Sequence, residues 1–232
     1  MAMVKWGGGL ARWMLAALAG VLAGQAAALE CGGGEPCRVA GGTYHIAVPE
    51  GWQGGPAVMH LHGFGSSGAK VIGNTGFTSA FTARGYAVIA PTALPWREGK
   101  PTDWSVRDGW NTYPRDDLVF LREVLADAAA RAGVDPDRLL LSGFSRGASM
   151  VWDAACRAPG FARAYAPASG GFWLPMAHDC AGPVALLHTH GFADPVVPLE
   201  GRSINSTETG QVFTQADVWQ GLQLWRLENA CR

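Results

Sequence analysis

The 232-residue sequence predicts an α/β fold with a mostly parallel sheet and helices packed on both faces of the sheet. Three observations lead to this prediction. Short apolar runs alternate with longer helical stretches, and no internal repeat interrupts them. Hydrophobic residues make up 48% of the chain, which is enough for one domain with a sizeable core. We therefore expect a single domain over residues 29–232.

The elements follow from these runs in chain order. The longest predicted helix covers residues 115–132, because leucine, valine and alanine recur there at helical spacing and Gly133 ends the pattern. Residues 146–155 and an amphipathic stretch over 215–227 are predicted to form two shorter helices. Strands are expected at residues 44–48, 56–63, 86–91, 138–142, 161–170 and 184–191.

The first 28 residues have the three-part layout of a secretory signal peptide. Lys5 and Arg12 precede an apolar stretch over residues 13–22, and small residues permit cleavage after Ala26 or Ala28. A retained membrane anchor is the alternative, but this stretch is short and alanine-rich for a span of roughly 20 residues. We expect a secreted or periplasmic protein without stable membrane association after cleavage.

Export makes the five cysteines candidates for disulfides. Cys31 and Cys37 flank a flexible glycine-rich segment that can close a small loop. Cys156 and Cys180 form the next plausible pair, which leaves Cys231 without a partner near the chain end.

Charge and composition narrow the class of ligand. The formal net charge is -1 and only 16% of residues are charged, so nucleic acid is not an expected partner. The chain contains 32 glycines and 10 tryptophans, which provide tight turns and broad aromatic surfaces. Such a composition suits an enzyme that acts on an apolar or sugar-linked substrate.

The pattern G-x-S-x-G at residues 143–147 is weak by itself, and a structural loop serine is the alternative. Its context favours a nucleophile, because the motif follows an apolar strand and opens a helix. Ser145 is therefore the candidate nucleophile, and the N–H of Arg146 is a candidate oxyanion donor. The second donor is expected to be the N–H of Phe64, in the glycine-rich loop "HLHGFGSSG".

Asp194 is the candidate acid, because it follows the nucleophile in the chain and lies just past a predicted strand. A turn aspartate in an Asp-Pro pair is the alternative. The two His-x-His pairs, at 60–62 and 188–190, could suggest metal ligands. We interpret them as strand-end residues and expect neither a metal nor a cofactor.

Four segments together resemble the secreted α/β-hydrolase esterases grouped with polyhydroxybutyrate depolymerases and feruloyl esterases. They are "HLHGFGSSG", "RDDLVFLREVL", "GVDPDRLLLSGFSRGASM" and "HGFADPVVP". The resemblance covers roughly residues 31–231 and implies an α/β-hydrolase fold acting on an ester substrate. It implies the same roles for Ser145, Asp194, Phe64 and Arg146, and it supports both disulfides. The acyl group could be a hydroxyalkanoate, a ferulate or an acetyl group.

One departure from that family concerns the catalytic base. The family's histidine comes last, after the acid, but no histidine follows His190. Together with the unpaired Cys231, this leads us to expect a chain that lacks the family's last strand and histidine loop. His178 is the least unfavourable substitute, ahead of His188. The alternatives to an active esterase are a non-catalytic binding protein and a product that does not fold stably.

Overall fold

The structure is a computed structural model that describes residues 1–3, 29, 31–110 and 112–231. The expected signal peptide over residues 1–28 lies almost entirely outside the described residues. Within the part of the chain that is described, no helix combines the length and the apolar character needed to cross a membrane.

A six-stranded sheet forms the centre of the fold, with strand order β1-β2-β4-β3-β5-β6. Strands β4, β3, β5 and β6 are parallel, and β1 and β2 add an antiparallel edge. The predicted α/β class is therefore confirmed. The strands are β1 (Cys37–Val39), β2 (Gly42–Ala47), β3 (Gly55–Leu61), β4 (Ala87–Pro91), β5 (Val134–Phe144) and β6 (Ala164–Ala168).

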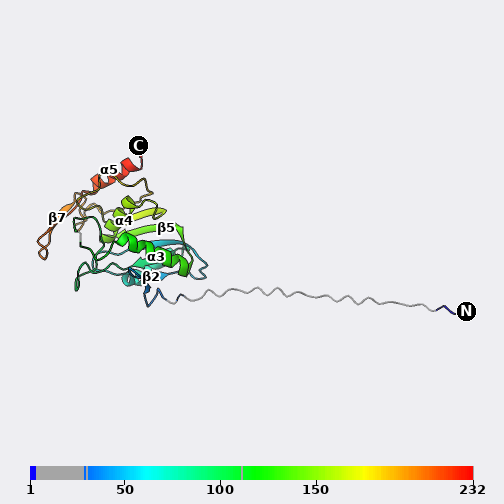
Figure 1. Cartoon of the computed structure of the whole chain (residues 1–232). Helices are drawn as coiled ribbons and strands as arrows, with labels where there is room; N and C mark the ends of the chain where they lie inside the picture. Colours follow the sequence, from blue (N-terminus) through cyan, green and yellow to red (C-terminus); the bar gives the residue numbers. More distant parts are fainter. Residues whose placement is uncertain (4–28, 30, 111, 232) are drawn as a thin grey trace.

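Figure 1 shows α3 and α4 lying along the sheet and α5 beyond α4, at the end of the chain. Helix α3 begins where Asp116 accepts a hydrogen bond from the Leu118 N–H, and it ends at Gly133, which has a φ of 67°. The helix ends at the predicted residue and begins two residues later than predicted, after the Asp116 cap. The helices are α1 (Gly68–Gly73), α2 (Thr75–Thr82), α3 (Asp117–Ala132), α4 (Arg146–Arg157) and α5 (Val218–Glu228).

The regular strand predicted over residues 184–191 is wrong. This segment runs parallel to β6 but forms only two isolated bridges, Tyr165 with Leu186 and Ala168 with Thr189. Tyr165 uses both its N–H and its carbonyl toward the segment, whereas Pro167 only accepts, from the Thr189 N–H at 3.2 Å. Proline has no N–H to donate, so the ladder is interrupted at its centre.

A hairpin that the sequence patterns did not predict follows this edge. Strands β7 (Arg202–Asn205) and β8 (Val212–Gln215) pair with each other in a separate two-stranded sheet. Figure 1 shows the hairpin extending away from the main sheet. Because its strands are short and largely polar, they lack the apolar run that marks a core strand.

The two predicted disulfides are present. Cys31 bonds Cys37, and Cys156 at the end of α4 bonds Cys180. Cys231 is exposed and free within the described residues.

Helix α5 makes its closest approach to the core at Gly221. Trp152 of α4 is fully buried and meets Phe172 edge to face, with ring centroids 4.9 Å apart. A Cβ on Gly221 would lie only 2.7 Å from the Trp152 ring and 3.3 Å from Phe172. The missing side chain at Gly221 is therefore what allows α5 to pack against α4.

We predict that Gly221→Ala lowers the free energy of unfolding by about 1–3 kcal/mol, because the added methyl group overpacks a rigid aromatic cluster. Gly76→Ala in α2 is the matched control, since its Cβ would meet only the Asn74 side chain at 3.6 Å. The control should be neutral or stabilising, as alanine is the better helix former. Urea unfolding followed by fluorescence measures both; equal effects would contradict the docking role of Gly221.

Candidate active site

Ser145 lies in a strained turn between β5 and α4. Its φ is 54° and its ψ is -120°, a conformation that is rare for residues other than glycine. The Ser145 N–H donates to the Ala168 carbonyl at the end of β6, with an N to O distance of 3.0 Å. This is the geometry that a nucleophile elbow requires, with the side chain lifted above the carboxyl ends of the strands.

Glycines permit this turn because three backbone segments meet there. A Cβ on Gly147 would lie 2.1 Å from the Leu61 carbonyl oxygen of β3, and one on Gly143 would lie 2.6 Å from the Gly147 carbonyl carbon. A Cβ on Gly170 would lie 2.6 Å from the Ser145 carbonyl oxygen. The glycines of the motif thus allow backbone segments to approach closely, as well as permitting the turn itself.

The loop after β3 approaches the serine. A Cβ on Gly63 would lie 3.6 Å from the Ser145 Cβ, and Phe64 follows directly. Phe64, Ser145 and Arg146 all line one cavity. Arg146 is the first residue of α4, where N–H groups have no partner within the helix. The structure thus brings together the serine and the two expected oxyanion donors, whose roles remain predictions.

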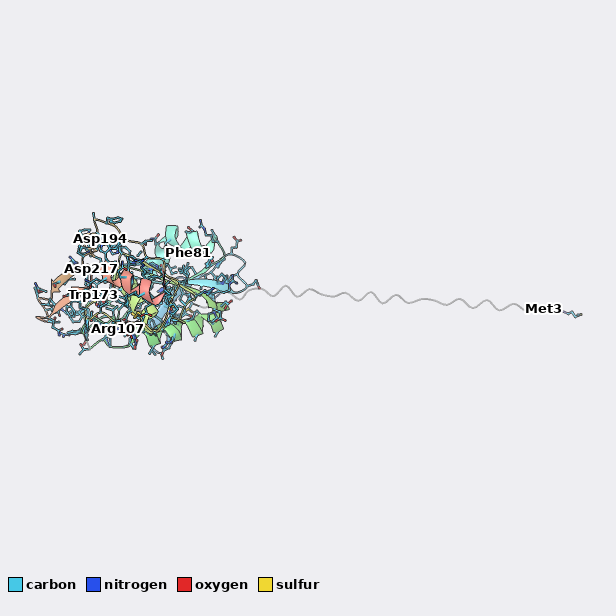
Figure 2. All side chains as sticks on the ribbon, turned by 90° about the horizontal axis from the view of Figure 1, so that it is seen from above. Met3, Phe81, Arg107, Trp173, Asp194 and Asp217 are labelled. Carbon is cyan, nitrogen blue, oxygen red and sulfur yellow. A yellow bond between two sulfur atoms is a disulfide. The ribbon has the colours of Figure 1, made fainter. Side chains whose placement is uncertain are left out.

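The cavity beside Ser145 has a volume of about 400 Å³ and is rich in aromatic side chains. Trp96, Trp110 and Tyr113 come from the segment that joins β4 to α3, called here the β4–α3 segment. Phe213 comes from the β7–β8 hairpin, and Trp173 follows β6. Figure 2 shows Trp173 and Asp194 at the same end of the molecule as the hairpin.

The β4–α3 segment and the β7–β8 hairpin, which form two walls of the cavity, contact each other. The ring centroids of Trp96 and Trp110 are 5.8 Å apart, and those of Trp110 and Phe213 are 6.2 Å apart. Lys100 of the β4–α3 segment also pairs with Glu208 of the hairpin turn, with an N to O distance of 2.7 Å. An aromatic row therefore spans from one wall to the other.

A buried charge cluster at Arg146 was not predicted from the sequence. The Arg146 Nε donates to Asp103 at 2.6 Å and its Nη2 donates to Asp108 at 2.5 Å. The Tyr113 hydroxyl accepts from Nη2 and donates to Asp108 at 2.8 Å. The guanidinium also lies 4.5 Å from the Trp173 ring centroid. The only sequence signal was the charged residue directly after the nucleophile.

The cluster changes the acidity of its members. Burial alone would lower the pKa of Arg146, but Asp103, Tyr113 and Asp108 outweigh it and raise that pKa above its ordinary value. Burial raises the pKa of Asp103, and the pairing with Arg146 offsets this only in part. The pKa of Tyr113 is raised, chiefly by burial, so its hydroxyl stays protonated.

Asp194 lies in the loop after the 184–191 segment, as predicted. One of its carboxylate oxygens accepts the N–H groups of Val196 and Val197, each at 2.9 Å. The hydrogen bond from Val197 is the largest cause of a lowered pKa of Asp194, and burial opposes it. Val196 and Val197 line the cavity, so Asp194, the expected acid, lies at its edge.

The histidine nearest to Asp194 is already engaged. His190 Nε2 lies 3.9 Å from the Asp194 carboxylate but donates to the Val197 carbonyl at 2.7 Å. Its Nδ1 faces His188 Nε2 at 3.1 Å, and the His188 ring packs edge to face on Trp152. With both nitrogens of His190 engaged, its ring is not available as a base in this arrangement.

The other histidines also do not line the cavity. None of the six, all of which are among the described residues, lines the cavity. His60 and His62 bond to Ser142 and to the backbone of Gly63 and Ala93, which confirms their interpretation as strand-end residues. His178 is exposed, and Cys180, two residues further on, is bonded to Cys156 at the end of α4.

The fold is that of the α/β-hydrolases. The carboxylesterase of Bacillus cereus matches it with a TM-score of 0.57 at 15% identity, over 80% of each chain. A profile of the phospholipase/carboxylesterase family also matches residues 121–217.

The chain is related to esterases of this class. It is 31% identical over 173 residues to the protein named "Putative esterase NocK" of Nocardia uniformis, which covers 70% of this chain and 46% of that protein. It is 27% identical over 177 residues to feruloyl esterase C of Emericella nidulans, covering 71% of this chain and 59% of that protein. The chain thus spans about half the length of these relatives, and the predicted resemblance to α/β-hydrolase esterases, feruloyl esterases among them, is confirmed.

The buried His188 generates a pH prediction. Burial, with a smaller effect of His190, lowers its pKa from 6.5 to about 4. The unfolded chain therefore takes up a proton in this interval that the folded chain does not. The resulting stability is fully present above pH 6.5 and is lost as the pH falls toward 4.

We expect His188→Gln, which cannot titrate, to reduce the difference in urea midpoint between pH 7 and pH 5. His178→Gln, at an exposed position, should leave that difference unchanged. If His188→Gln retains the full wild-type difference, the assignment to His188 is wrong.

Proposed function

We propose that this chain is a serine esterase that hydrolyses carboxylic esters through an acyl-enzyme. One observation carries the proposal: Ser145 holds a strained backbone conformation at a cavity that also contains both expected oxyanion donors. A structural loop serine gives no reason for a φ of 54° beside a cavity of this size. The relatedness to esterases supports the same reaction class.

The proposed reaction follows from the placement of these groups. The Ser145 hydroxyl attacks the ester carbonyl, and the N–H groups of Phe64 and Arg146 stabilise the developing oxyanion. The alcohol leaves with a proton, and water then attacks the acyl-enzyme to release the acid. In a complete triad an imidazole oriented by the acid carries the proton in each step. No histidine lines the cavity in the described residues, so the proton passes to solvent and both steps are expected to be slow.

A second candidate function rests on the histidines. Since no histidine lines the cavity in the described part of the chain, the same architecture could serve a non-catalytic binding protein. Such a protein would retain the cavity and the aromatic row without the proton transfers. The serine esterase remains our first proposal because binding alone does not require the strained serine.

The proposed substrate is an ester of the kind cleaved by feruloyl esterases or polyhydroxybutyrate depolymerases. Trp96, Trp110, Tyr113 and Phe213 support an aromatic acyl group, because aromatic rings pack well in offset or edge-to-face arrangements. The name of the Emericella relative is consistent with ferulate. No cofactor is part of this proposal.

We predict that residues 1–232 hydrolyse p-nitrophenyl butyrate slowly. Serine hydrolases that lack one triad member retain roughly 10³- to 10⁴-fold catalysis over water, several orders of magnitude below a complete triad. Ser145→Ala should remove the serine-dependent part. Asp194→Asn should change the rate less than about threefold, because no imidazole depends on that carboxylate.

Turnover of the purified variants beside His178→Ala and His190→Ala tests this prediction. A fast reaction that disappears in either histidine variant would identify the base and overturn the expectation of slow turnover. Labelling of Ser145 by an organophosphonate, absent in Ser145→Ala, distinguishes the esterase from the binding protein. An unlabelled serine together with a rate no higher than that of Ser145→Ala would favour the second candidate.

We propose that the chain is exported to an oxidising compartment. Its two disulfides support this location, because reducing compartments seldom retain them. N-terminal sequencing of the exported protein should place the mature start near Leu29. A mature chain that still begins at Met1 would contradict it.

A further inference from the structure

The β4–α3 segment has one anchor at the end of β3 and a second at Arg146. At the first, the fully buried Trp104 donates its indole N–H to the His62 carbonyl at 2.7 Å. At the second, Asp103, Asp108 and Tyr113 converge on Arg146. The second anchor is thus attached to the residue that directly follows Ser145.

The groups of this second anchor are almost fully withdrawn from water. The side chains of Arg146 and Asp108 are 7% and 2% exposed, and that of Asp103 is 12% exposed. Charges buried to this degree are tolerated when hydrogen bonds satisfy them, and removing one partner leaves the others uncompensated. The geometry is also specific, because the planar guanidinium meets Asp103 with two nitrogens, at 2.6 and 3.2 Å.

The position of Arg146 gives this cluster a consequence for the reaction. Its side chain is held by the cluster, while its backbone N–H is the expected oxyanion donor at the first position of α4. An oxyanion donor is effective only when it is fixed in position before the charge develops. Restraining the side chain in four directions, including the Trp173 ring at 4.5 Å, restrains the backbone that carries it.

We propose that Asp103, Asp108 and Tyr113 are positioning residues, which hold Arg146 so that its backbone N–H faces the oxyanion and the β4–α3 segment closes the cavity wall. All three also line the cavity, but their proposed effect on the oxyanion acts through Arg146. This inference rests on the proposed esterase function for its effect on turnover, but the restraint on Arg146 can be measured without it.

The same segment supplies a matched control. Arg107 pairs with Asp153 of α4 at 2.5 Å, and the Asp153 side chain is 3% exposed. Neither residue lines the cavity at Ser145. Asp153→Asn therefore removes a half-exposed ion pair between the same segment and the same helix, along with the longer Asp153–Arg157 pair within α4, and neither pair lines the cavity.

The test compares Asp108→Asn and Tyr113→Phe with Asp153→Asn in the full chain. Asp108→Asn keeps the acceptor for the Trp110 N–H but loses the charge that faces Arg146. Tyr113→Phe keeps the ring and removes only the hydroxyl, so it provides a milder variant if the first folds poorly. Hydrogen exchange of backbone amides, thermal unfolding and turnover of p-nitrophenyl acetate are measured for each.

We expect Asp108→Asn and Tyr113→Phe to increase exchange in peptides that cover residues 145–149. They should also lower kcat by roughly tenfold, with a smaller change in KM; losing an oxyanion donor altogether costs about 10²- to 10³-fold. Asp153→Asn should reduce thermal stability but leave exchange at 145–149 and kcat near the wild-type values. If these residues only stabilised the fold, each of the three variants would lose kcat to the extent that it loses thermal stability, and Asp153→Asn would behave like the other two.

Two results would overturn the inference: unchanged exchange at residues 145–149 in Asp108→Asn and Tyr113→Phe, or an equal loss of kcat in Asp153→Asn. If the wild-type chain shows no serine-dependent turnover, the esterase proposal fails. The restraint on Arg146 is then decided by the exchange measurement alone. The two failures are therefore distinguishable.

Discussion

The close contact between the first turn of α4 and the end of β3 determines the geometry of the whole site. Gly147 packs directly against the Leu61 carbonyl, where any side chain would meet that oxygen at 2.1 Å. Holding α4 this close to the sheet leaves the connecting residue little freedom, and Ser145 takes its strained conformation as a result. Neighbouring strands supply the remaining support, through the hydrogen bond from the Ser145 N–H to Ala168.

Around that contact, the cavity is built from parts that do not belong to the main sheet. The β4–α3 segment and the β7–β8 hairpin each contribute aromatic walls, and the Lys100–Glu208 pair joins them. The exposed ion pair contributes little to stability by itself. The cluster at Arg146 is different, because its charged side chains are largely withdrawn from water and a lost partner leaves them uncompensated. Of the contacts that hold the cavity walls, those at Arg146, the residue after Ser145, are therefore the most important.

Backbone hydrogen bonds hold Asp194, the expected acid, in place. Two N–H groups hold one Asp194 oxygen and keep the carboxylate ionised, so its orientation does not require an imidazole. His190 reaches toward the same loop but bonds the Val197 carbonyl and His188 instead. His188 and His190 thus help to pack the 184–191 segment against Trp152. Hydrogen bonds from or to the backbone thus hold both Ser145 and Asp194, and no histidine among the described residues lines the cavity beside them.

Local sequence determined the features that depend on local chemistry. The apolar runs specified the parallel strands, Asp116 and Gly133 specified the ends of α3, and the glycines around Ser145 specified a sharp turn. Only the tertiary structure decided which distant groups meet. No periodicity in the sequence links Asp103, Asp108 and Tyr113 to Arg146. The hydrogen-bond ladder between β6 and the 184–191 segment is interrupted by Pro167 of β6. Such contacts depend on where separate loops come together, which no local pattern encodes.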